Sequence, residues 1–173
     1  MAGGGLAIGV QFPISELFGA GTAAAQSATE AAEVNAWVVI KPDDSVIIRM
    51  ARSEMGQGTI TGLAQLVAEE LECDWKKVTY EYPTPGTNLK RKRVWGDYST
   101  GGSRGIRTSH DYVRRAGGAA KMMLMQAAAN EWKVPVSELS VDKGVITHKA
   151  SGRTTSYGKV ADAAAKLTPP NEK

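Results

Sequence analysis

The sequence predicts an α+β fold in which a small, mostly antiparallel sheet is covered by a medium helix, one long helix and a C-terminal helix. Two runs of β-branched residues joined by a short turn, at positions 36–41 and 45–51, predict a hairpin. Apolar residues then recur at every third or fourth position over 60–71, which predicts an amphipathic helix. The segment 104–132 carries small and apolar residues at helical spacing and predicts the long helix.

Composition is that of one soluble domain. The chain has 173 residues, of which 42% are hydrophobic and 23% are charged. We expect residues 1–34 to form a flexible leader, residues 35–170 the folded domain and residues 171–173 a short tail. The leader contains three glutamates and no Lys or Arg, so the remainder, with 21 basic and 15 acidic residues, carries +6. Cys73 is the only cysteine, so an iron–sulfur relay must lie on another chain.

The leader resembles the back half of an export signal. A short uncharged run over 3–10 precedes a tract of small residues in which Ala23 and Ala25 form an A-x-A cleavage pattern. The alternative is a low-complexity leader without a targeting role. The apolar run is much shorter than the ~20 residues that cross a bilayer, so we expect no transmembrane helix.

The expected strands open the folded part. The hairpin strands are apolar at nearly every position, which indicates a sheet covered by helices on one face and partly buried on the other. Residues 76–82 alternate in character and predict a third strand, which Pro83 and Pro85 end.

A glycine-bracketed loop connects the second strand to the first helix. Gly56 and Gly58 flank Gln57, and both glycines can adopt a positive φ and let a ligand approach the backbone closely. Thr59 is the expected N-cap. The unpaired N–H groups of such a helix start favour an anionic or oxygen-rich ligand. The alternative is a tight turn before a helix that only packs.

A second glycine loop follows a long segment, 83–100, that contains the basic run Lys90–Arg93. Loops of this length in compact domains are usually functional or disordered. The basic run is typical of a solvated or partner-binding surface. Gly101 and Gly102 allow close backbone approach, and Ser103 offers a hydroxyl and an N-cap to the next helix. Two such junctions that meet would form an amide-lined cradle for a polyanion.

The second half of the chain contains the long helix and smaller elements. Gly117 and Gly118 are expected to allow tight packing against the sheet or to kink this helix. The sequence predicts no metal site, because His110 has no second His or Cys at ligand spacing. His148 is expected at the surface. The remaining expectations are core methionines at 122, 123 and 125, short strands over 139–141 and 145–148, and a closing helix over 154–166 that begins near residue 156.

Several stretches together resemble a known family. They are NAWVVIKPDDSVIIRMARSEMGQGT, LVAEELECDWKKV, VWGDYSTGGSRGIR and SGRTTSYGKVADAAAK. They are similar to the N-terminal part of the molybdenum-binding subunit of the xanthine oxidase family, in the branch of isoquinoline 1-oxidoreductase and membrane-associated aldehyde dehydrogenase. The resemblance covers residues 35–170. It implies that Gly56, Gln57 and Gly58 contact a molybdopterin cofactor, with the Gln57 amide bonding the pterin edge or a molybdenum oxygen. It implies the same contact for the second loop, whose cofactor-binding residues would be Gly101, Gly102 and Ser103.

The resemblance also implies a function. Relatives hydroxylate an aldehyde or an N-heteroaromatic compound, and the cofactor, in its plain or its cytosine dinucleotide form, would be shared with the remainder of the subunit. The implied partners are that remainder, a small 2Fe-2S subunit and, as a further candidate, a cytochrome c subunit, with no nucleic acid. The implied location is the periplasm, with the cytoplasm as the alternative.

This chain departs from the family at the catalytic base. The family's general base is a glutamate in a late Gly-Glu motif that has no counterpart here, and Glu54 aligns with a structural glutamate of the loop. We therefore expect no catalytic residue in this chain and no turnover by it alone. Two other classes stay open: a non-catalytic binding domain, and a basic phosphate- or nucleic-acid-binding module that uses Lys90–Arg93. A dinucleotide-binding domain is excluded because no G-x-G-x-x-G follows a strand.

Overall fold

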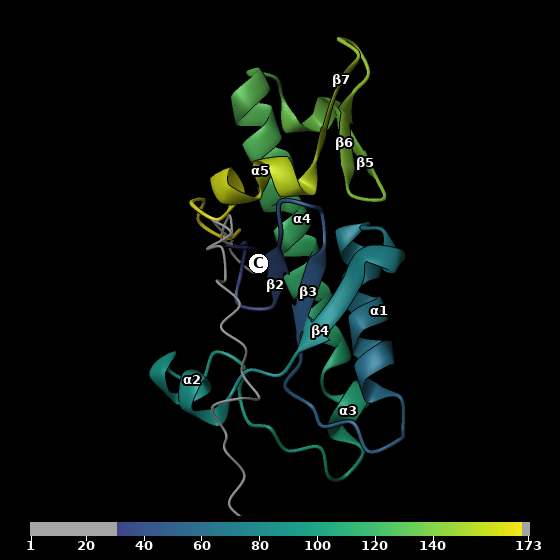
Figure 1. Ribbon diagram of the computed structural model, residues 1–173, viewed down its shortest axis with the longest axis vertical. Coiled ribbons are helices and arrows are strands. Elements are labelled where there is room, and N and C mark those ends of the chain that lie inside the picture. The colour runs from purple at the N-terminus through teal and green to yellow at the C-terminus, as the bar shows by residue number, and fades with distance from the viewer. Residues whose placement is uncertain (1–30, 171–173) are drawn as a thin grey trace, which may run out of the picture.

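The computed structural model describes residues 31–170, and the expected tail and almost all of the expected leader lie outside this range (Figure 1). The described part begins with a strand, β1 (Ala32–Glu33), that falls inside the segment expected to be leader. Ala32 is buried and pairs with Ile40. The fold therefore includes the last residues before Asn35.

The main sheet has four strands in chain order. They are β1, β2 (Val38–Ile40), β3 (Val46–Arg49) and β4 (Val78–Glu81). The pairs β1–β2 and β2–β3 are antiparallel, as the hairpin pattern predicts, with Val38 opposite Ile48. The pair β3–β4 is parallel. Between these strands, α1 (Thr59–Leu71) and a short 3-10 helix, η2 (Trp75–Lys77), carry the chain back to the end of the sheet at which β3 begins. The expected α+β class with a mostly antiparallel sheet is confirmed.

A second, three-stranded sheet lies at the upper end of the molecule in Figure 1. It is antiparallel and consists of β5 (Leu139–Asp142), β6 (Val145–His148) and β7 (Arg153–Ser156), preceded by a 3-10 helix, η3 (Val136–Glu138). The closing helix was expected over 154–166, but residues 154–156 belong to β7. They form a strand because two β-branched residues, Thr154 and Thr155, pair with Thr147 and Ile146 of β6. The closing helix, α5, is Tyr157–Ala164.

The expected long helix is two helices, α3 (Arg104–Arg107) and α4 (His110–Trp132). The break falls at Ser109, which is fully buried. Its hydroxyl donates to Arg104 O at 3.2 Å and accepts hydrogen bonds from Arg52 Nε and Tyr112 Oη. A side chain that bonds the preceding turn in this way competes with helix continuation.

A short helix, α2 (Pro85–Lys90), lies in the segment expected to be a loop. Pro85 occupies its first turn, and the Thr84 hydroxyl accepts a hydrogen bond from the Thr87 N–H at 3.1 Å. Threonine before a proline is a typical helix start, so the signal was present in the sequence. The expectation of a continuous loop over 83–100 was wrong at this point.

α1 and α4 pack closely against each other where Gly117 of α4 meets α1. A Cβ built on Gly117 would lie 2.5 Å from the carbonyl oxygen of Val67 on α1. The expected tight packing is therefore against α1 rather than against the sheet. A Cβ built on Gly118 would meet nothing within 4 Å.

Two other expectations about side-chain burial need correction. His148 was expected at the surface, but it is only 5% exposed. Its Nε2 lies 2.8 Å from Glu138 Oε2 and its Nδ1 lies 2.7 Å from Ser151 Oγ, so it links β6 to η3 and to the following turn. Of the methionines expected in the core, Met123 is buried whereas Met122 is 57% exposed.

Tyr157→Phe should lower the free energy of unfolding by about 1–3 kcal/mol. The Tyr157 hydroxyl is buried and donates to Leu71 O at 2.6 Å, which joins α5 to the end of α1. Its removal leaves that carbonyl without its partner, and burial already raises the pKa of the hydroxyl. Urea denaturation measures the change. Tyr80→Phe, at an exposed ring, is the control and should change stability by less than about 0.5 kcal/mol. Equal effects of the two variants would contradict the role of this hydrogen bond.

Candidate cofactor-binding site

The two glycine loops meet at one cavity. It has a volume of about 550 Å³, and the predicted residues Gln57, Gly101, Gly102 and Ser103 line it. Its other lining residues are Met55, Thr59, Thr100, Gly105, Ile106 and Arg107. Gly56 and Gly58 belong to the first loop without lining the cavity. The structure thus brings together the two junctions that the sequence singled out.

Direct contacts hold the two loops side by side. The Ser53 N–H donates to Thr100 Oγ1 at 2.9 Å. At the helix starts, a Cβ built on Gly105 of α3 would lie 2.6 Å from Thr59 Oγ1 of α1. Such close approach requires glycine at position 105.

The backbone amides of the first loop are already bonded to the Glu54 carboxylate. Its Oε1 accepts hydrogen bonds from Gly56 N at 2.7 Å and Gly58 N at 3.0 Å, and its Oε2 accepts one from Ile60 N at 3.0 Å. The expectation of unpaired donors at the start of α1 is therefore wrong at Ile60, whose N–H is already bonded. Thr59 is not the N-cap either: Gly58 takes this position at φ 76°, and Glu54 supplies the capping oxygens from outside the helix.

The Gln57 amide is also engaged inside its own loop. Its Oε1 accepts a hydrogen bond from Met55 N at 2.6 Å, and its Nε2 donates to Ser53 O and to Thr59 Oγ1, both at 2.9 Å. Gln57 lines the cavity, but its side chain holds the loop in shape. The sequence suggested an amide presented to a ligand, and the structure shows one bonded to the chain.

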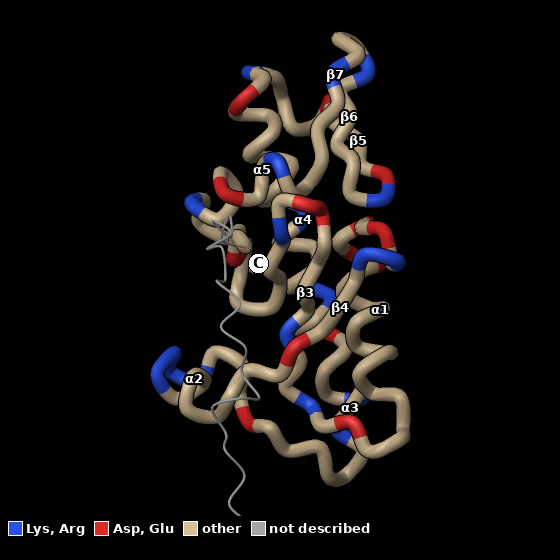
Figure 2. Tube along the Cα trace, in the orientation of Figure 1, with Lys and Arg blue, Asp and Glu red and all other residues tan. Residues whose placement is uncertain are grey.

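The second loop leaves its donors open. Within residues 31–170, the N–H groups of Gly101, Gly102 and Ser103 make no hydrogen bond, and Ser103 is an N-cap without a side-chain cap bond. A Cβ built on either glycine would meet nothing within 4 Å, and Gly102 has φ +68°. The Arg107 guanidinium lies beside the loop, with its Nη2 donating to Gly102 O at 3.1 Å. Figure 2 shows the basic positions of α3 next to the glycine loops.

Arg52 is a site residue that sequence reasoning missed. It is only 7% exposed, and it donates to Ser109 Oγ and Asp97 Oδ1, both at 2.9 Å, and to the backbone oxygen of Ser99. These bonds fix the segment that leads into the second loop against the start of α4. Hydrogen bonding by Arg52 is also the main reason why the pKa of Asp97 is lowered. The sequence did contain a signal, which is an arginine directly after an apolar strand. An arginine buried at such a position needs hydrogen-bond partners and therefore points to a polar network.

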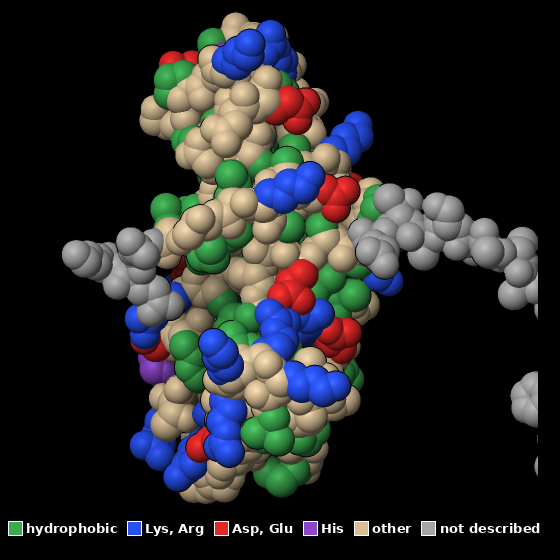
Figure 3. All heavy atoms as spheres, turned by 90° about the vertical axis from the view of Figure 1, so that its left-hand side faces the viewer, with side chains coloured by type: hydrophobic (Ala, Val, Ile, Leu, Met, Phe, Trp, Pro, Cys, Tyr) green, Lys and Arg blue, Asp and Glu red, His purple; other side chains and the backbone are tan. Residues whose placement is uncertain are grey.

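The basic run does not act as one patch. Arg91 Nη2 lies 2.5 Å from Glu33 Oε1, and the Arg91 guanidinium stacks 4.8 Å from the centre of the Trp95 ring. Lys90, Lys92 and Arg93 are exposed. Figure 3 shows Lys and Arg side chains gathered over the lower half of one face of the molecule. Part of the run therefore has a structural role.

Two classes of feature are absent from residues 31–170. No three His, Cys, Asp or Glu side chains in this part of the chain are arranged to hold a metal ion. No helix in it has the length and apolar character needed to cross a bilayer.

Comparison with known proteins agrees with the geometry of the two loops. A family model described as molybdopterin cofactor-binding domain matches residues 4–172. The chain belongs to this family. The chain is 35% identical over 140 residues to isoquinoline 1-oxidoreductase subunit beta of Brevundimonas diminuta, a match that covers 80% of the chain and 18% of the relative. It is 32% identical over 128 residues to a membrane-bound aldehyde dehydrogenase [pyrroloquinoline-quinone] of Gluconacetobacter polyoxogenes, covering 74% and 16%.

A solved structure shares the fold. The Cu,Mo-CO dehydrogenase in its carbon monoxide reduced state matches with a TM-score of 0.52 and 25% identity, over 73% of this chain and 15% of the dehydrogenase chain. The expected likeness to molybdenum-binding subunits of the xanthine oxidase family is confirmed. The domain spans less than a fifth of the length of each of these relatives.

The residues fit such a cofactor on one side of the cavity. The second loop offers accessible N–H groups, a hydroxyl and a guanidinium beside a cavity that no Cβ fills, and these donors suit a group rich in oxygen atoms. The first loop instead contributes shape, because its amides already hold Glu54. The binding of cofactor by the six predicted residues stays a prediction.

Glu54→Gln should weaken the fold in a pH-dependent way. Hydrogen bonds from Ile60 N and Gly58 N lower the pKa of Glu54 below its ordinary value. A carboxylate with a lowered folded-state pKa stabilises the fold above its unfolded-state pKa of about 4.3, and this contribution is lost as the pH falls through the folded-state pKa. The difference in Tm between the native protein and Glu54→Gln should thus be largest near pH 7 and shrink in acid. Glu131→Gln, at an exposed position on α4, is the control and should show no such trend. A pH-independent difference for Glu54→Gln would contradict this account.

Proposed function

We propose that the domain forms one wall of the cofactor site in a molybdenum hydroxylase that oxidises an aldehyde or an N-heteroaromatic compound. The observation that carries the proposal is the single cavity that is lined both by Gly101, Gly102 and Ser103, whose amides make no hydrogen bond, and by Gln57 of the first loop. The names of the two relatives support the substrate classes. When bound, the molybdenum cofactor supplies the two-electron redox chemistry.

In this proposal, the residues of the domain bind the cofactor and hold it in position. The second-loop N–H groups, the Ser103 hydroxyl and the Arg107 guanidinium donate hydrogen bonds to oxygen atoms of the bound group. Glu54 and Gln57 keep the first loop in one conformation, and Arg52 holds the approach to the second. Preorganised donors of this kind do not have to reorient when the ligand binds.

The proton-accepting group of the reaction lies elsewhere in the subunit. Glu54 is the carboxylate nearest to the glycine turn in sequence, but both of its oxygens accept backbone hydrogen bonds and its pKa is lowered, which makes it a poor base. The remainder of the subunit would therefore supply the catalytic glutamate.

The same proposal extends to the assembly. Isoquinoline 1-oxidoreductase subunit beta is by name one of several subunits, which supports a separate 2Fe-2S subunit for this chain, with its single cysteine. A cytochrome c subunit, the cytosine dinucleotide form of the cofactor and a periplasmic location complete the proposal.

Gly102→Ala in the assembled molybdenum subunit should lower the molybdenum content by a factor of roughly ten, in the range found when residues that orient a metal site are changed. The added Cβ strains a residue at φ +68° and displaces amides that bind the cofactor. Metal analysis of the purified enzyme measures the effect.

Gly152→Ala is the matched control. Gly152 has φ +70° and equally open surroundings but lies in the turn between β6 and β7. It should show the same backbone strain and full molybdenum content. Full content in Gly102→Ala as well would remove the second loop from the site.

A further inference from the structure

Thr100 connects the two glycine loops. It lines their common cavity, but it is not one of the six residues predicted from the sequence to bind the cofactor. Its hydroxyl oxygen accepts a hydrogen bond from Ser53 N at 2.9 Å. Within the described part of the chain, no other hydrogen bond runs between the first loop, 53–58, and the second, 99–103. This one side chain therefore joins the two loops that meet at the cavity.

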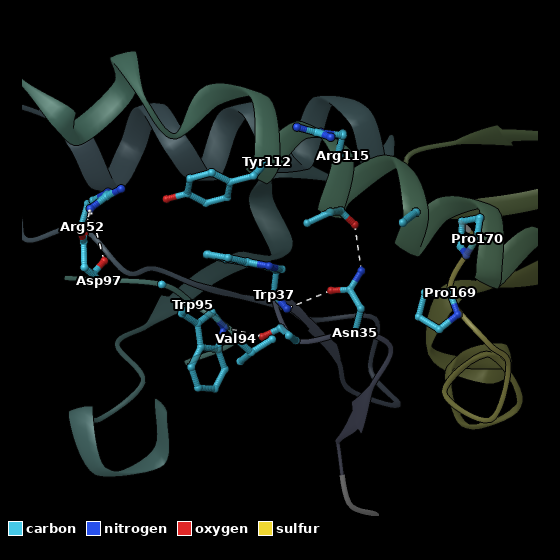
Figure 4. A pocket seen from close by; sticks show the side chains of 14 residues that line it. Asn35, Trp37, Arg52, Val94, Trp95, Asp97, Tyr112, Arg115, Pro169 and Pro170 are labelled. Carbon is cyan, nitrogen blue, oxygen red and sulfur yellow. Dashed lines mark hydrogen bonds and ion pairs between the residues drawn. The ribbon is translucent and has the colours of Figure 1, made fainter. Parts of the chain in front are cut away.

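Contacts on both sides fix the position of Thr100. Its carbonyl oxygen accepts a hydrogen bond from Arg104 N at 3.3 Å, which ties it to the start of α3. The carbonyl oxygen of the preceding residue, Ser99, accepts a hydrogen bond from Arg52, and the same guanidinium bonds Asp97, as Figure 4 shows. Threonine is β-branched, so its side chain has few open rotamers. The hydroxyl therefore has a defined position relative to both loops.

The Thr100 hydroxyl still has a hydrogen bond to give. A hydroxyl group is one donor and accepts through two lone pairs. The Ser53 N–H occupies an acceptor position, whereas no atom of residues 31–170 accepts a hydrogen bond from the Thr100 O–H. This O–H belongs to a cavity-lining residue next to the three open N–H groups of the second loop. An oxygen atom of a bound group can accept from it without breaking the bond to Ser53.

We propose that Thr100 is a further cofactor-binding residue and that it couples the two loops. Its O–H donates to an oxygen atom of the bound group while its oxygen continues to accept from Ser53 N. Hydrogen bonds arranged in such a chain strengthen one another, so a group bound at the second loop also holds the first. The inference rests on the proposed function, because it takes the molybdenum cofactor as the group that fills the cavity.

Thr100→Val in the assembled molybdenum subunit tests the inference. Valine keeps the branched shape of threonine and lacks the hydroxyl, so the molybdenum content should fall about five- to tenfold. Thr100→Ser keeps the hydroxyl on a less restricted side chain and should retain most of the molybdenum. Metal analysis of the purified enzymes measures both effects.

Thr108→Val is the matched control. Thr108 Oγ1 donates to Arg104 O at 3.0 Å, so this substitution also removes one hydroxyl hydrogen bond close to the second loop. Thr108 is exposed and does not line the cavity. The variant should therefore contain as much molybdenum as the native subunit.

Hydrogen exchange of the Ser53 amide is a second measurement, made on the 173-residue chain without cofactor. Thr100→Val should speed this exchange about fivefold, because the amide loses its acceptor. Thr108→Val should leave the exchange unchanged. The same rate in Thr100→Val and the native chain would show that Thr100 does not couple the loops and would overturn that part of the inference.

The molybdenum contents separate this inference from the proposed function. A native subunit without molybdopterin would overturn the proposed function and this inference with it. A loaded native subunit and an equally loaded Thr100→Val would overturn only the role of Thr100. Equal losses in Thr100→Val and Thr108→Val, or no recovery in Thr100→Ser, would also overturn that role, because the hydroxyl would not be responsible for the loss.

Discussion

Gly117→Ala should lower the free energy of unfolding by about 2–4 kcal/mol, whereas Gly118→Ala should raise it by about 0.5–1 kcal/mol. The added Cβ at position 117 would lie 2.5 Å from Val67 O and 3.1 Å from the Glu70 Cβ, so α1 and α4 must move apart. At position 118 the Cβ enters open space and alanine is the better helix former. Urea denaturation of both variants measures the two effects.

The pair of neighbouring glycines is its own control. Both substitutions add one methyl group to the same helix, so helix propensity alone would stabilise both variants by similar amounts. Changes of opposite sign in the free energy of unfolding would therefore show that α1 and α4 are in close contact at Gly117. Stabilisation by both substitutions would mean that the two helices do not pack this closely.

Arg52→Leu should lower the free energy of unfolding by about 2–4 kcal/mol and loosen the second glycine loop. Arg52 is buried and donates to Ser109 and to the Asp97–Ser99 segment, and leucine leaves these acceptors without their donor. Arg52→Lys should lose part of this stabilisation, because an ammonium group cannot reach the same acceptors with a planar fork. Denaturation measures stability, and hydrogen exchange of the Ser53 and Arg104 amides, which donate to Thr100 of the second loop, measures the loop.

Arg104→Leu is the control for this prediction. Arg104 lies 3.5 Å from the other carboxylate oxygen of Asp97, but about half of its side chain is exposed. Removing an exposed ion pair changes stability by about 0–1 kcal/mol. If Arg104→Leu and Arg52→Leu had equal effects, the ion pair with Asp97 rather than the buried network would be responsible.

The pattern of the sequence was sufficient for elements that depend on near neighbours. The β2–β3 hairpin and α1 follow from β-branched runs, a turn and a 3.6-residue repeat, each of which acts over a few positions. It was not sufficient where a side chain reached across the fold. Ser109 ends α3 through bonds that include one from Arg52, 57 positions away, and no local pattern contains that information.

The glycine loops show the same division within the site. Their sequence motifs located both turns, and the structure brings them to one cavity. The assignment of donors to the first loop was wrong, because the conformation of the turn lets the Glu54 carboxylate reach three amides that spacing alone leaves open. A carboxylate four positions before a glycine is an unspecific signal until the turn is known.

The sequence by itself determined the β2–β3 hairpin, α1, the two glycine turns and the resemblance to molybdenum-binding subunits, because short-range patterns and motifs carry this information. Only the tertiary structure decided which N–H groups remain open, how Arg52 couples the loops, and that the two glycine loops meet at one cavity. Each of these depends on distances between residues far apart in the chain. Such distances are set when the helices pack on the sheet, after the local structure is determined.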